Sequence, residues 1–170
     1  VHYCAHCDGY LYRGRTVAVV GGGNSAVADA LQLSRMAKKV YLIHRRDKLR
    51  AEKAVSAPLF RAENVEIVYN AQVESLLREG RLTGLRLQDG RELRVDGLFV
   101  SIGRKPATEL FSGQLDLDNG GYVIAGEDTQ TNIPGVYAVG DVRSKPLRQI
   151  VTAVADGAMA AHMAEAFLSN

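Results

Sequence analysis

The first part of the chain alternates between short apolar runs and longer stretches with the spacing of a helix. Residues 16–20, TVAVV, form a β-branched run, and residues 39–44 form a second apolar run. Between these runs lies a glycine turn, followed by a stretch in which apolar residues recur at helical spacing. The pattern predicts a strand, a helix and a second strand joined as one βαβ unit.

The next part of the chain continues this alternation. A second helical stretch is predicted near residues 50–61, and strand-forming residues follow at 65–77. Residues 81–95 predict a hairpin that turns at an Asp-Gly pair, and residues 98–103 form another buried strand. We therefore expect an α/β fold in which a Rossmann-like parallel sheet has helices on both faces plus a small antiparallel hairpin layer. This domain is expected to occupy residues 1–107.

The remaining residues, 108–170, have a different character. Polar, glycine-rich connections lead to one strand at 136–141 and one helix at about 149–168. The helix carries a largely apolar stripe made of Ile150, Val154, Ala158, Ala161, Ala164 and Phe167. Such a stripe needs a partner surface, and the tail itself supplies none. With 170 residues, the chain suits one well-buried domain and a remnant rather than two complete domains.

A glycine-rich turn directly follows the first strand and precedes the first helix. Gly21, Gly23 and Ala26 fit the pattern GxGxxG/A, which in this context predicts a dinucleotide-binding turn. The first glycine permits the tight turn, the second lets a pyrophosphate approach the backbone, and the alanine allows close packing of helix on strand. The residues expected to contact the dinucleotide are Gly21, Gly22, Gly23, Asn24, Ser25 and Ala26. The alternative is that the glycines form only a strand-to-helix turn.

The end of the second strand indicates which nucleotide is bound, because NAD sites usually place an acidic residue there. The chain instead reads HRRDKLR, from His44 to Arg50. Arg45 and Arg46 leave the strand at the expected distance, and Arg50 shares a face with Arg46 if a helix begins there. Guanidinium groups form charge-assisted pairs with a 2′-phosphate, so this cluster predicts NADPH. The alternatives are a solvated basic cluster and an NADH site that uses Asp47.

The chain has two cysteines, Cys4 and Cys7, which form a CxxC motif followed by Asp8. This spacing suits a reversible disulfide, and Asp8 is a candidate general acid or base for thiol exchange if it is buried. One alternative is a zinc site that also uses His2 and His6, although one short segment does not easily surround a tetrahedral ion. The other is that the cysteines are inert apolar residues. We predict a redox-active pair and no metal.

The composition narrows the range of functions. Positive and negative charges are interspersed and sum to +2, so no basic face suited to nucleic acid is expected. No apolar run reaches the ~18 residues of a membrane span, and residues 1–30 lack the pattern of a signal peptide. We therefore expect a soluble, cytoplasmic protein that binds neither nucleic acid nor membrane.

The order and spacing of these motifs closely resemble those of the low-molecular-weight, flavin-dependent thioredoxin reductases. The resemblance begins with CAHCDG, GGGNSA and HRRDKLR. It continues through IGRKPAT, TNIPGVYAVGD and LRQIVTAVADGAMAA, so that it covers essentially the whole chain. The resemblance implies NADPH and FAD as cofactors and thioredoxin as the partner.

The resemblance also implies that the chain is a fragment. The family begins with a separate FAD-binding unit that has its own GxGxxG motif, whereas this sequence has no second such motif and no methionine at Val1. In the family, the flavin domain combines segments before and after the NADPH domain. Residues 1–107 would therefore be the NADPH domain with its CxxC dithiol, and residues 108–170 the second segment of an incomplete FAD domain. Such a fragment is expected to be inactive alone, and the parent protein to be a homodimer.

The family implies a route for the electrons: hydride passes from NADPH to FAD, electrons pass to the Cys4–Cys7 disulfide, and the dithiol reduces thioredoxin. Cys7 is expected nearer the flavin, and Asp8 is expected to handle the proton. Because the dithiol and NADPH take turns at the flavin in the family, hinges are expected near residues 1–15 and 103–110.

Several residues of the tail are assigned to FAD by the resemblance. Asp141 is expected on the ribityl chain, with Gly140 allowing close approach. The helix N-terminus formed by Arg148, Gln149 and Ile150 is expected at the flavin ring, where partial positive charge favours the reduced anion. The cofactor-binding residues expected outside the glycine turn are thus His44, Arg45, Arg46, Arg50, Gly103, Gly140, Asp141, Arg148, Gln149 and Ile150.

Two other functions fit part of the pattern. A related NADH-dependent flavoprotein that reduces a bacterial peroxiredoxin shares CxxCDG, the glycine turn and the closing flavin motif, but it generally lacks HRRxxxR. A catalytically silent nucleotide-binding module would keep the glycine turn and lose the cysteines or Asp8. Since this chain has both the arginines and the cysteines, we expect an NADPH-dependent thioredoxin reductase.

Overall fold

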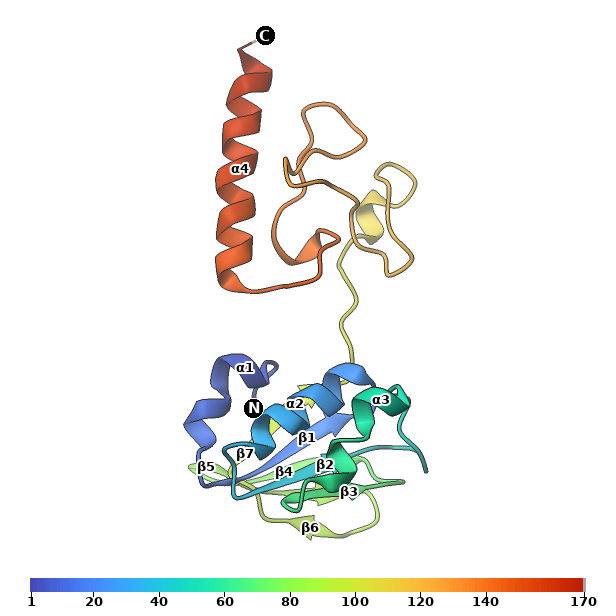
Figure 1. Ribbon diagram of the computed structural model, residues 1–170, viewed down its shortest axis with the longest axis vertical. Helices are drawn as coiled ribbons and strands as arrows, with labels where there is room; N and C mark the ends of the chain where they lie inside the picture. The colour runs from blue at the N-terminus through green and yellow to red at the C-terminus, as the bar shows by residue number, and fades with distance from the viewer. Residues whose placement is uncertain (170) are drawn as a thin grey trace. The chain divides into compact units, whose positions relative to one another are not determined.

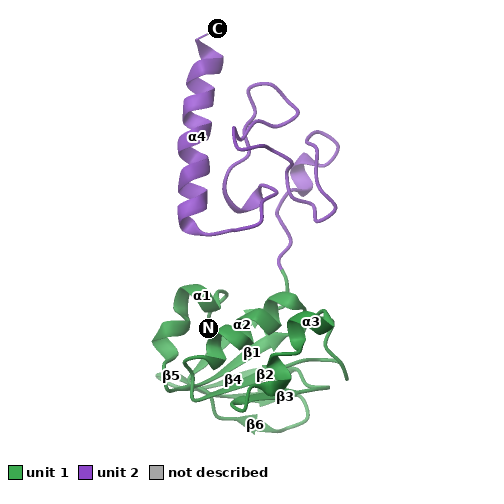
Figure 2. Ribbon diagram, in the orientation of Figure 1, with its two compact units in different colours: residues 1–103 green, residues 104–170 purple. Residues whose placement is uncertain are grey.

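The computed structural model describes residues 1–169. The chain divides into two compact units, Val1–Gly103 (unit 1) and Arg104–Asn170 (unit 2), coloured separately in Figure 2. Along residues 1–169, no helix is both long and apolar enough to cross a membrane.

Unit 1 contains a four-stranded parallel sheet in the order β3-β2-β1-β7. Its strands are β1 (Thr16–Gly21), β2 (Lys39–Ile43), β3 (Val65–Val68) and β7 (Gly97–Ser101). Helix α2 (Asn24–Ser34) connects β1 to β2, so the predicted βαβ unit is confirmed. The chain order reverses at β1, which pairs with β2 on one side and with β7 on the other.

The core of unit 1 follows from the two-residue period of its central strand. Val17 and Val19 of β1 pack with α2, whereas Ala18 between them packs with the opposite layer. All three are fully buried, which explains why the strand reads as a continuous apolar run.

The two faces of the parallel sheet are covered by different layers (Figure 1). One face is covered by α2 together with the short helices α1 (Ala5–Asp8) and α3 (Lys53–Ser56). The other face is covered by an antiparallel sheet of β4 (Val73–Glu79), β5 (Arg81–Leu87) and β6 (Glu92–Leu93). The fold class and the antiparallel layer are confirmed. The expectation of helices on both faces is wrong, because Leu85, Leu87 and Val95 already bury the second face.

The second predicted helix is much shorter than expected. Of residues 50–61, only α3 and the 3-10 turn η2 (Leu59–Arg61) are helical. The amides of Arg50 and Ala51 both donate to the Gly22 carbonyl, at 2.7 and 3.1 Å, so this stretch cannot begin a helix. Pro58 ends α3 two residues after Ser56. Arg46 and Arg50 therefore do not share a helical face.

Unit 2 consists mainly of turns and one long helix, α4 (Ile150–Leu168), as predicted. It also has the short 3-10 turns η3 (Glu109–Phe111) and η4 (Gly140–Val142). The strand predicted at 136–141 is wrong: only an isolated bridge between Gln130 and Tyr137 forms there. The reason is that the segment finds no long neighbouring strand with which to build a ladder within the described part of unit 2.

The interior of unit 2 is held largely by charged groups. Asp156 of α4 is buried and accepts hydrogen bonds from Arg143 Nη2 at 2.8 Å, Lys145 Nζ at 2.6 Å and the Gly140 amide at 2.9 Å. Arg143 also donates to the Gly126 carbonyl at 2.7 Å. By contrast, Ile150 and Val154 on the predicted apolar stripe of α4 are 85% and 66% exposed.

Candidate functional site

The glycine turn is shaped by close packing at its first position. A Cβ on Gly21 would lie 2.3 Å from the Ser101 carbonyl oxygen and 2.6 Å from the Ala26 Cβ. Both distances are too short for any side chain, which accounts for the glycine and for the small residue at position 26. At Gly23, in contrast, a Cβ would meet no atom within 4 Å, so the space above this backbone is open. Gly23 is the N-cap of α2, whose first amides have no acceptor within the helix.

The middle glycine of the turn is explained by His44. A Cβ on Gly22 would lie 2.2 Å from His44 Nδ1, so only glycine allows the ring to pack there. The His44 backbone is fixed by hydrogen bonds with Val68 and Ala71. Its Nε2 atom is buried and has no hydrogen-bond partner among residues 1–169. A buried, unpartnered ring nitrogen beside the glycine turn is a feature that a ligand could satisfy.

The loop after β2 is tied to the glycine turn by several hydrogen bonds. Besides the two amides that donate to Gly22, Asn24 and Glu52 form a reciprocal pair in which Asn24 Nδ2 donates to Glu52 Oε1 and the Glu52 amide donates to Asn24 Oδ1, both at 2.9 Å. These contacts place Arg50 next to the start of α2. Sequence reasoning did not identify Glu52, whose role depends on this fold-specific contact.

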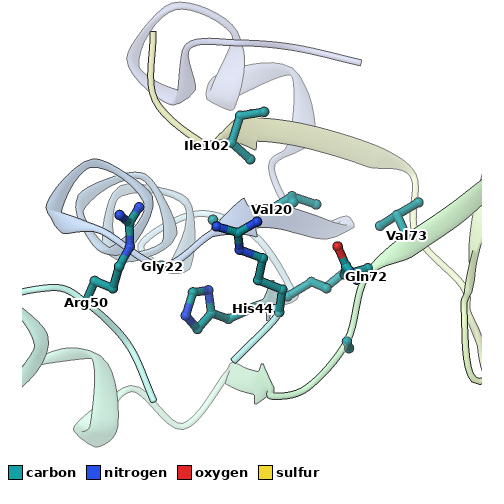
Figure 3. A pocket seen from close by; sticks show the side chains of 11 residues that line it. Val20, Gly22, His44, Arg50, Gln72, Val73 and Ile102 are labelled. Atoms are coloured by element: carbon teal, nitrogen blue, oxygen red, sulfur yellow. The ribbon is translucent and has the colours of Figure 1, made fainter. Parts of the chain in front are cut away.

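A pocket of about 410 Å³ opens at the carboxyl ends of the parallel strands, where the chain order reverses. Open α/β sheets bind ligands at this position. Figure 3 shows His44 and Arg50 near the Gly22 turn, with Ile102 across from them. The lining residues are Val20, Gly21, Gly22, Ile43, His44, Arg45, Arg50, Ala71, Gln72, Val73 and Ile102.

The pocket brings together only part of the expected nucleotide-binding set. Arg45 and Arg50 line it, and both are exposed, as is Arg46, which does not line it. Gly103 does not line it either. Gly103 has φ of 102° and ends unit 1, so its backbone conformation gives a reason for glycine that is independent of a ligand. Gln72 and Ile102 were not identified from the sequence, which gives no local signal for them.

The two cysteines form a disulfide, with their Cα atoms 5.3 Å apart. They lie at the start of unit 1, where Cys4 is the N-cap of α1 and its sulfur accepts from the Cys7 amide at 3.1 Å. Cys7 is exposed and Cys4 is partly buried, so solvent reaches the bond. No group of three or more His, Cys, Asp or Glu side chains within residues 1–169 is arranged to hold a metal ion.

Asp8 follows Cys7 directly and is held by a histidine. Its Oδ2 atom lies 2.9 Å from His2 Nδ1, and His2 Nε2 lies 2.7 Å from the Tyr12 hydroxyl. The Asp8 side chain is 40% exposed, so the burial on which its predicted acid–base role depends is only partial. Sequence reasoning treated His2 as an ordinary polar neighbour, because a six-residue separation gives no sign of this contact.

Unit 2 has its own pocket, of about 390 Å³, which includes two of the residues assigned to FAD by resemblance. Asp141 lies 3.5 Å from Arg104, and the Arg148 guanidinium stacks 3.8 Å from the centre of the Tyr122 ring. Gly140 has φ of 71° and donates its amide to Asp156. Gln149 is the N-cap of α4 and donates its amide to Thr152 Oγ1 at 3.0 Å, leaving Ile150 at the exposed helix start.

Comparisons with known proteins bear on the whole chain. The profile of the pyridine nucleotide-disulphide oxidoreductase family matches residues 1–157. The thioredoxin reductase of Coxiella burnetii is 48% identical over 184 residues, covering 100% of this chain and 58% of that protein. Among solved structures, thioredoxin reductase from Streptococcus pyogenes has a TM-score of 0.92 at 36% identity, covering 98% of this chain and 56% of that one. Thioredoxin reductase from Giardia duodenalis has a TM-score of 0.87 at 34% identity, covering 99% and 58%.

These findings confirm the resemblance that the motifs indicate. They also show that the chain spans less than two thirds of the length of each of these relatives.

Proposed function

Because the chain belongs to the pyridine nucleotide-disulphide oxidoreductase family, we propose that it is the part of a thioredoxin reductase that binds NADPH and carries the redox-active disulfide. The observation that supports this most is the combination found within unit 1. A phosphate-binding turn, a pocket with two arginines and a solvent-accessible Cys4–Cys7 disulfide occur in one compact unit.

The pocket and the adjacent start of α2 fit a nicotinamide dinucleotide phosphate. Gly23 leaves open space at the N-terminus of α2, where backbone amides favour a pyrophosphate. Arg45 and Arg50 supply two guanidinium groups suited to a 2′-phosphate, and no carboxylate is among the lining residues. When bound, the nicotinamide supplies a hydride, and the role of these side chains is to bind and orient the nucleotide.

FAD is the second cofactor that we propose. Unit 2 offers the carboxylate of Asp141 and the guanidinium of Arg148 along one pocket, next to a helix N-terminus that favours negative charge. A carboxylate accepts hydrogen bonds from sugar-alcohol hydroxyls such as those of a ribityl chain. When bound, the flavin transfers two electrons between nucleotide and disulfide.

The disulfide chemistry uses groups of this chain. Reduction of the Cys4–Cys7 bond takes two electrons and two protons and gives two thiols. In the reverse direction, one thiolate attacks the disulfide of thioredoxin and the second thiolate resolves the mixed disulfide, so thioredoxin is reduced while Cys4–Cys7 reforms. Asp8, directly after Cys7, is the proposed proton donor and acceptor.

We further propose that the additional length of the relatives matters for activity. Ile150 and Val154 of α4 expose apolar side chains that a complete flavin domain would cover. This chain alone is therefore expected to lack flavin-dependent turnover. The homodimer implied by the resemblance belongs to the longer protein.

The test is to assay thioredoxin reduction by a longer protein that contains this sequence together with a complete flavin domain. NADPH is expected to support turnover, and Cys4→Ser and Cys7→Ser are each expected to abolish it while leaving bound flavin in place. Arg35→Ala, at the exposed C-terminal end of α2, is the control and is expected to leave turnover unchanged. Turnover with NADH equal to that with NADPH would point instead to the peroxiredoxin-reducing relative.

A further inference from the structure

Three side chains near the Cys4–Cys7 disulfide in the sequence, those of Asp8, His2 and Tyr12, are joined by hydrogen bonds. Asp8 Oδ2 lies 2.9 Å from His2 Nδ1, and His2 Nε2 lies 2.7 Å from the hydroxyl of Tyr12. In a neutral ring, all three groups are satisfied when Nδ1–H donates to Asp8 and the Tyr12 hydroxyl donates to Nε2. Asp8 directly follows Cys7, so this series of hydrogen bonds begins at the residue next to the disulfide in the sequence.

The position of His2 is fixed by contacts with β7 and with neighbouring aromatic rings, in addition to its hydrogen bond with Asp8. Its amide donates to the Leu98 carbonyl at 2.8 Å and its carbonyl accepts from the Val100 amide at 2.8 Å, so its backbone pairs with β7. Its ring stacks on fully buried Phe99, with centroids 5.2 Å apart, and meets the edge of Tyr12. The side chain is 20% exposed, which leaves a route to water.

The groups around the ring define its electrostatic setting. Asp8 faces His2 from α1 and Tyr12 faces it from η1 (Gly9–Tyr12), whereas β7 presents the apolar ring of Phe99. Arg15 and Asp96 act on Tyr12 at longer range. Burial raises the pKa of Tyr12 above its ordinary value, so the hydroxyl keeps its proton at neutral pH.

The chemistry of these groups explains what a histidine adds. An ordinary carboxylic acid loses its proton at about pH 3.9, so at neutral pH it has none to give. An imidazole titrates at about pH 6.5 and still holds a proton near neutrality. When the two share a hydrogen bond, a proton held by the imidazole can move to the carboxylate.

We propose that His2 is a positioning residue for Asp8 and the proton reservoir of the dithiol, an inference that rests on the proposed role of Cys4, Cys7 and Asp8. When a cysteine thiolate attacks a substrate disulfide, the substrate S–S bond breaks and a new S–S bond forms. Asp8, present as a carboxylate, takes the Nδ1 proton of the His2 imidazolium and passes it to the departing sulfur, which keeps the electron pair of the broken bond. The step leaves Asp8 as a carboxylate and a neutral His2 ring that water reprotonates.

The test compares two disulfides whose departing groups differ in their need for a proton. The full chain is reduced, and its oxidation is followed with oxidised glutathione and with an aromatic disulfide between about pH 6 and 8. An aliphatic thiolate is basic and benefits from a proton donor, whereas an aromatic thiolate departs as a stable anion. His2→Gln is expected to slow the glutathione reaction about tenfold and to flatten its pH profile. The rate with the aromatic disulfide is expected to change less than about twofold, because its departing thiolate needs no proton donor.

Two comparisons show whether His2 acts through Asp8. His162→Gln removes a histidine from exposed α4 and is expected to leave both rates unchanged. The double variant Asp8→Asn, His2→Gln is expected to be no slower than Asp8→Asn alone, because the two residues form one unit. Full additivity, or an unchanged glutathione rate in His2→Gln, would overturn the proposal.

A second measurement avoids changing His2 at all. The ring signals of His2 are compared by NMR between the unmodified chain and Asp8→Asn, where they are expected to shift because the charge-assisted hydrogen bond from Nδ1 is lost. Unshifted ring signals contradict the proposal. Loss of NADPH binding would overturn the proposed function without affecting these rates, and a reduced chain inert to both disulfides would overturn the dithiol role itself.

Discussion

Adjacent glycines of the turn have different physical roles, which single substitutions separate. Gly22→Ala would place a methyl group 2.2 Å from the His44 ring, so we expect a loss of stability of about 1–3 kcal/mol. Gly23→Ala meets no atom within 4 Å and should cost no more than the ~1 kcal/mol typical of alanine at an N-cap, but its methyl group would occupy the open space proposed for the pyrophosphate. Urea unfolding and NADPH titration of both variants measure the two effects. Equal behaviour of the two variants would contradict this division of roles.

Asp156 is the residue on which the interior of unit 2 depends. Burial raises the pKa of its carboxyl, but hydrogen bonds from Lys145, Arg143 and the Gly140 amide outweigh burial and hold the pKa below its ordinary value. Asp156→Asn would remove the buried counter-charge of Arg143 and Lys145 and leave only the exposed Glu127 near Arg143, so we expect a loss of about 3 kcal/mol in the stability of unit 2. The loss is measured as faster hydrogen exchange of the α4 amides.

The lowered pKa also fixes a pH dependence. Because the folded-state pKa is depressed, the stabilisation is present above the unfolded-state value of about 3.9 and is lost as pH falls through the folded-state pKa. The protection of α4 should therefore fall in acid, and Asp156→Asn should remove that part of the dependence. Asp116→Asn, at an exposed carboxylate of the same unit, is the matched control. Equal protection of the two variants at neutral pH would refute the role of Asp156.

At the scale of elements, the sequence predicted well wherever periodicity and local chemistry act together. TVAVV became β1 because both faces of the strand are buried, and GGGNSA became the start of α2 because close packing at Gly21 allows only that turn. The length of α3 could not be predicted, because its start is set by hydrogen bonds from Arg50 and Ala51 to a turn far away in sequence. His2 was missed for the same reason: its pairing with β7 is tertiary.

The exposed stripe of α4 gives an element-scale prediction. Ile150→Gln and Val154→Gln together should change the stability of this chain by no more than about 0.5 kcal/mol, because both side chains are already exposed. In a longer protein with a complete flavin domain, the same two substitutions should lower flavin retention, because the polar glutamines would weaken the packing of α4 against the rest of that domain. Val123→Ala, at a buried site of unit 2, is the contrasting variant that should destabilise the chain itself. Unchanged flavin retention would contradict the proposal that the rest of the flavin domain packs on the apolar side chains of α4.

At the scale of the whole molecule, the two units are expected to contribute separable functions. Unit 1 has the glycine turn, the arginines and the disulfide, so nucleotide binding and thiol exchange should both be measurable in this chain. Turnover that couples them requires the flavin site proposed for unit 2. Continuous NADPH-dependent reduction of an aromatic disulfide by this chain, without added protein, would contradict the account.

The most direct test of the central claim is a titration of this chain with NADPH and, separately, with NADH. We expect NADPH to bind at least tenfold more tightly, a difference of about 1.4 kcal/mol. Arg45→Ala with Arg50→Ala should reduce this preference to near zero by weakening NADPH alone, whereas Arg35→Ala, at the opposite end of α2, should leave it intact. NADH binding as tight as NADPH binding, or a preference that survives loss of both arginines, would contradict the proposed nucleotide site.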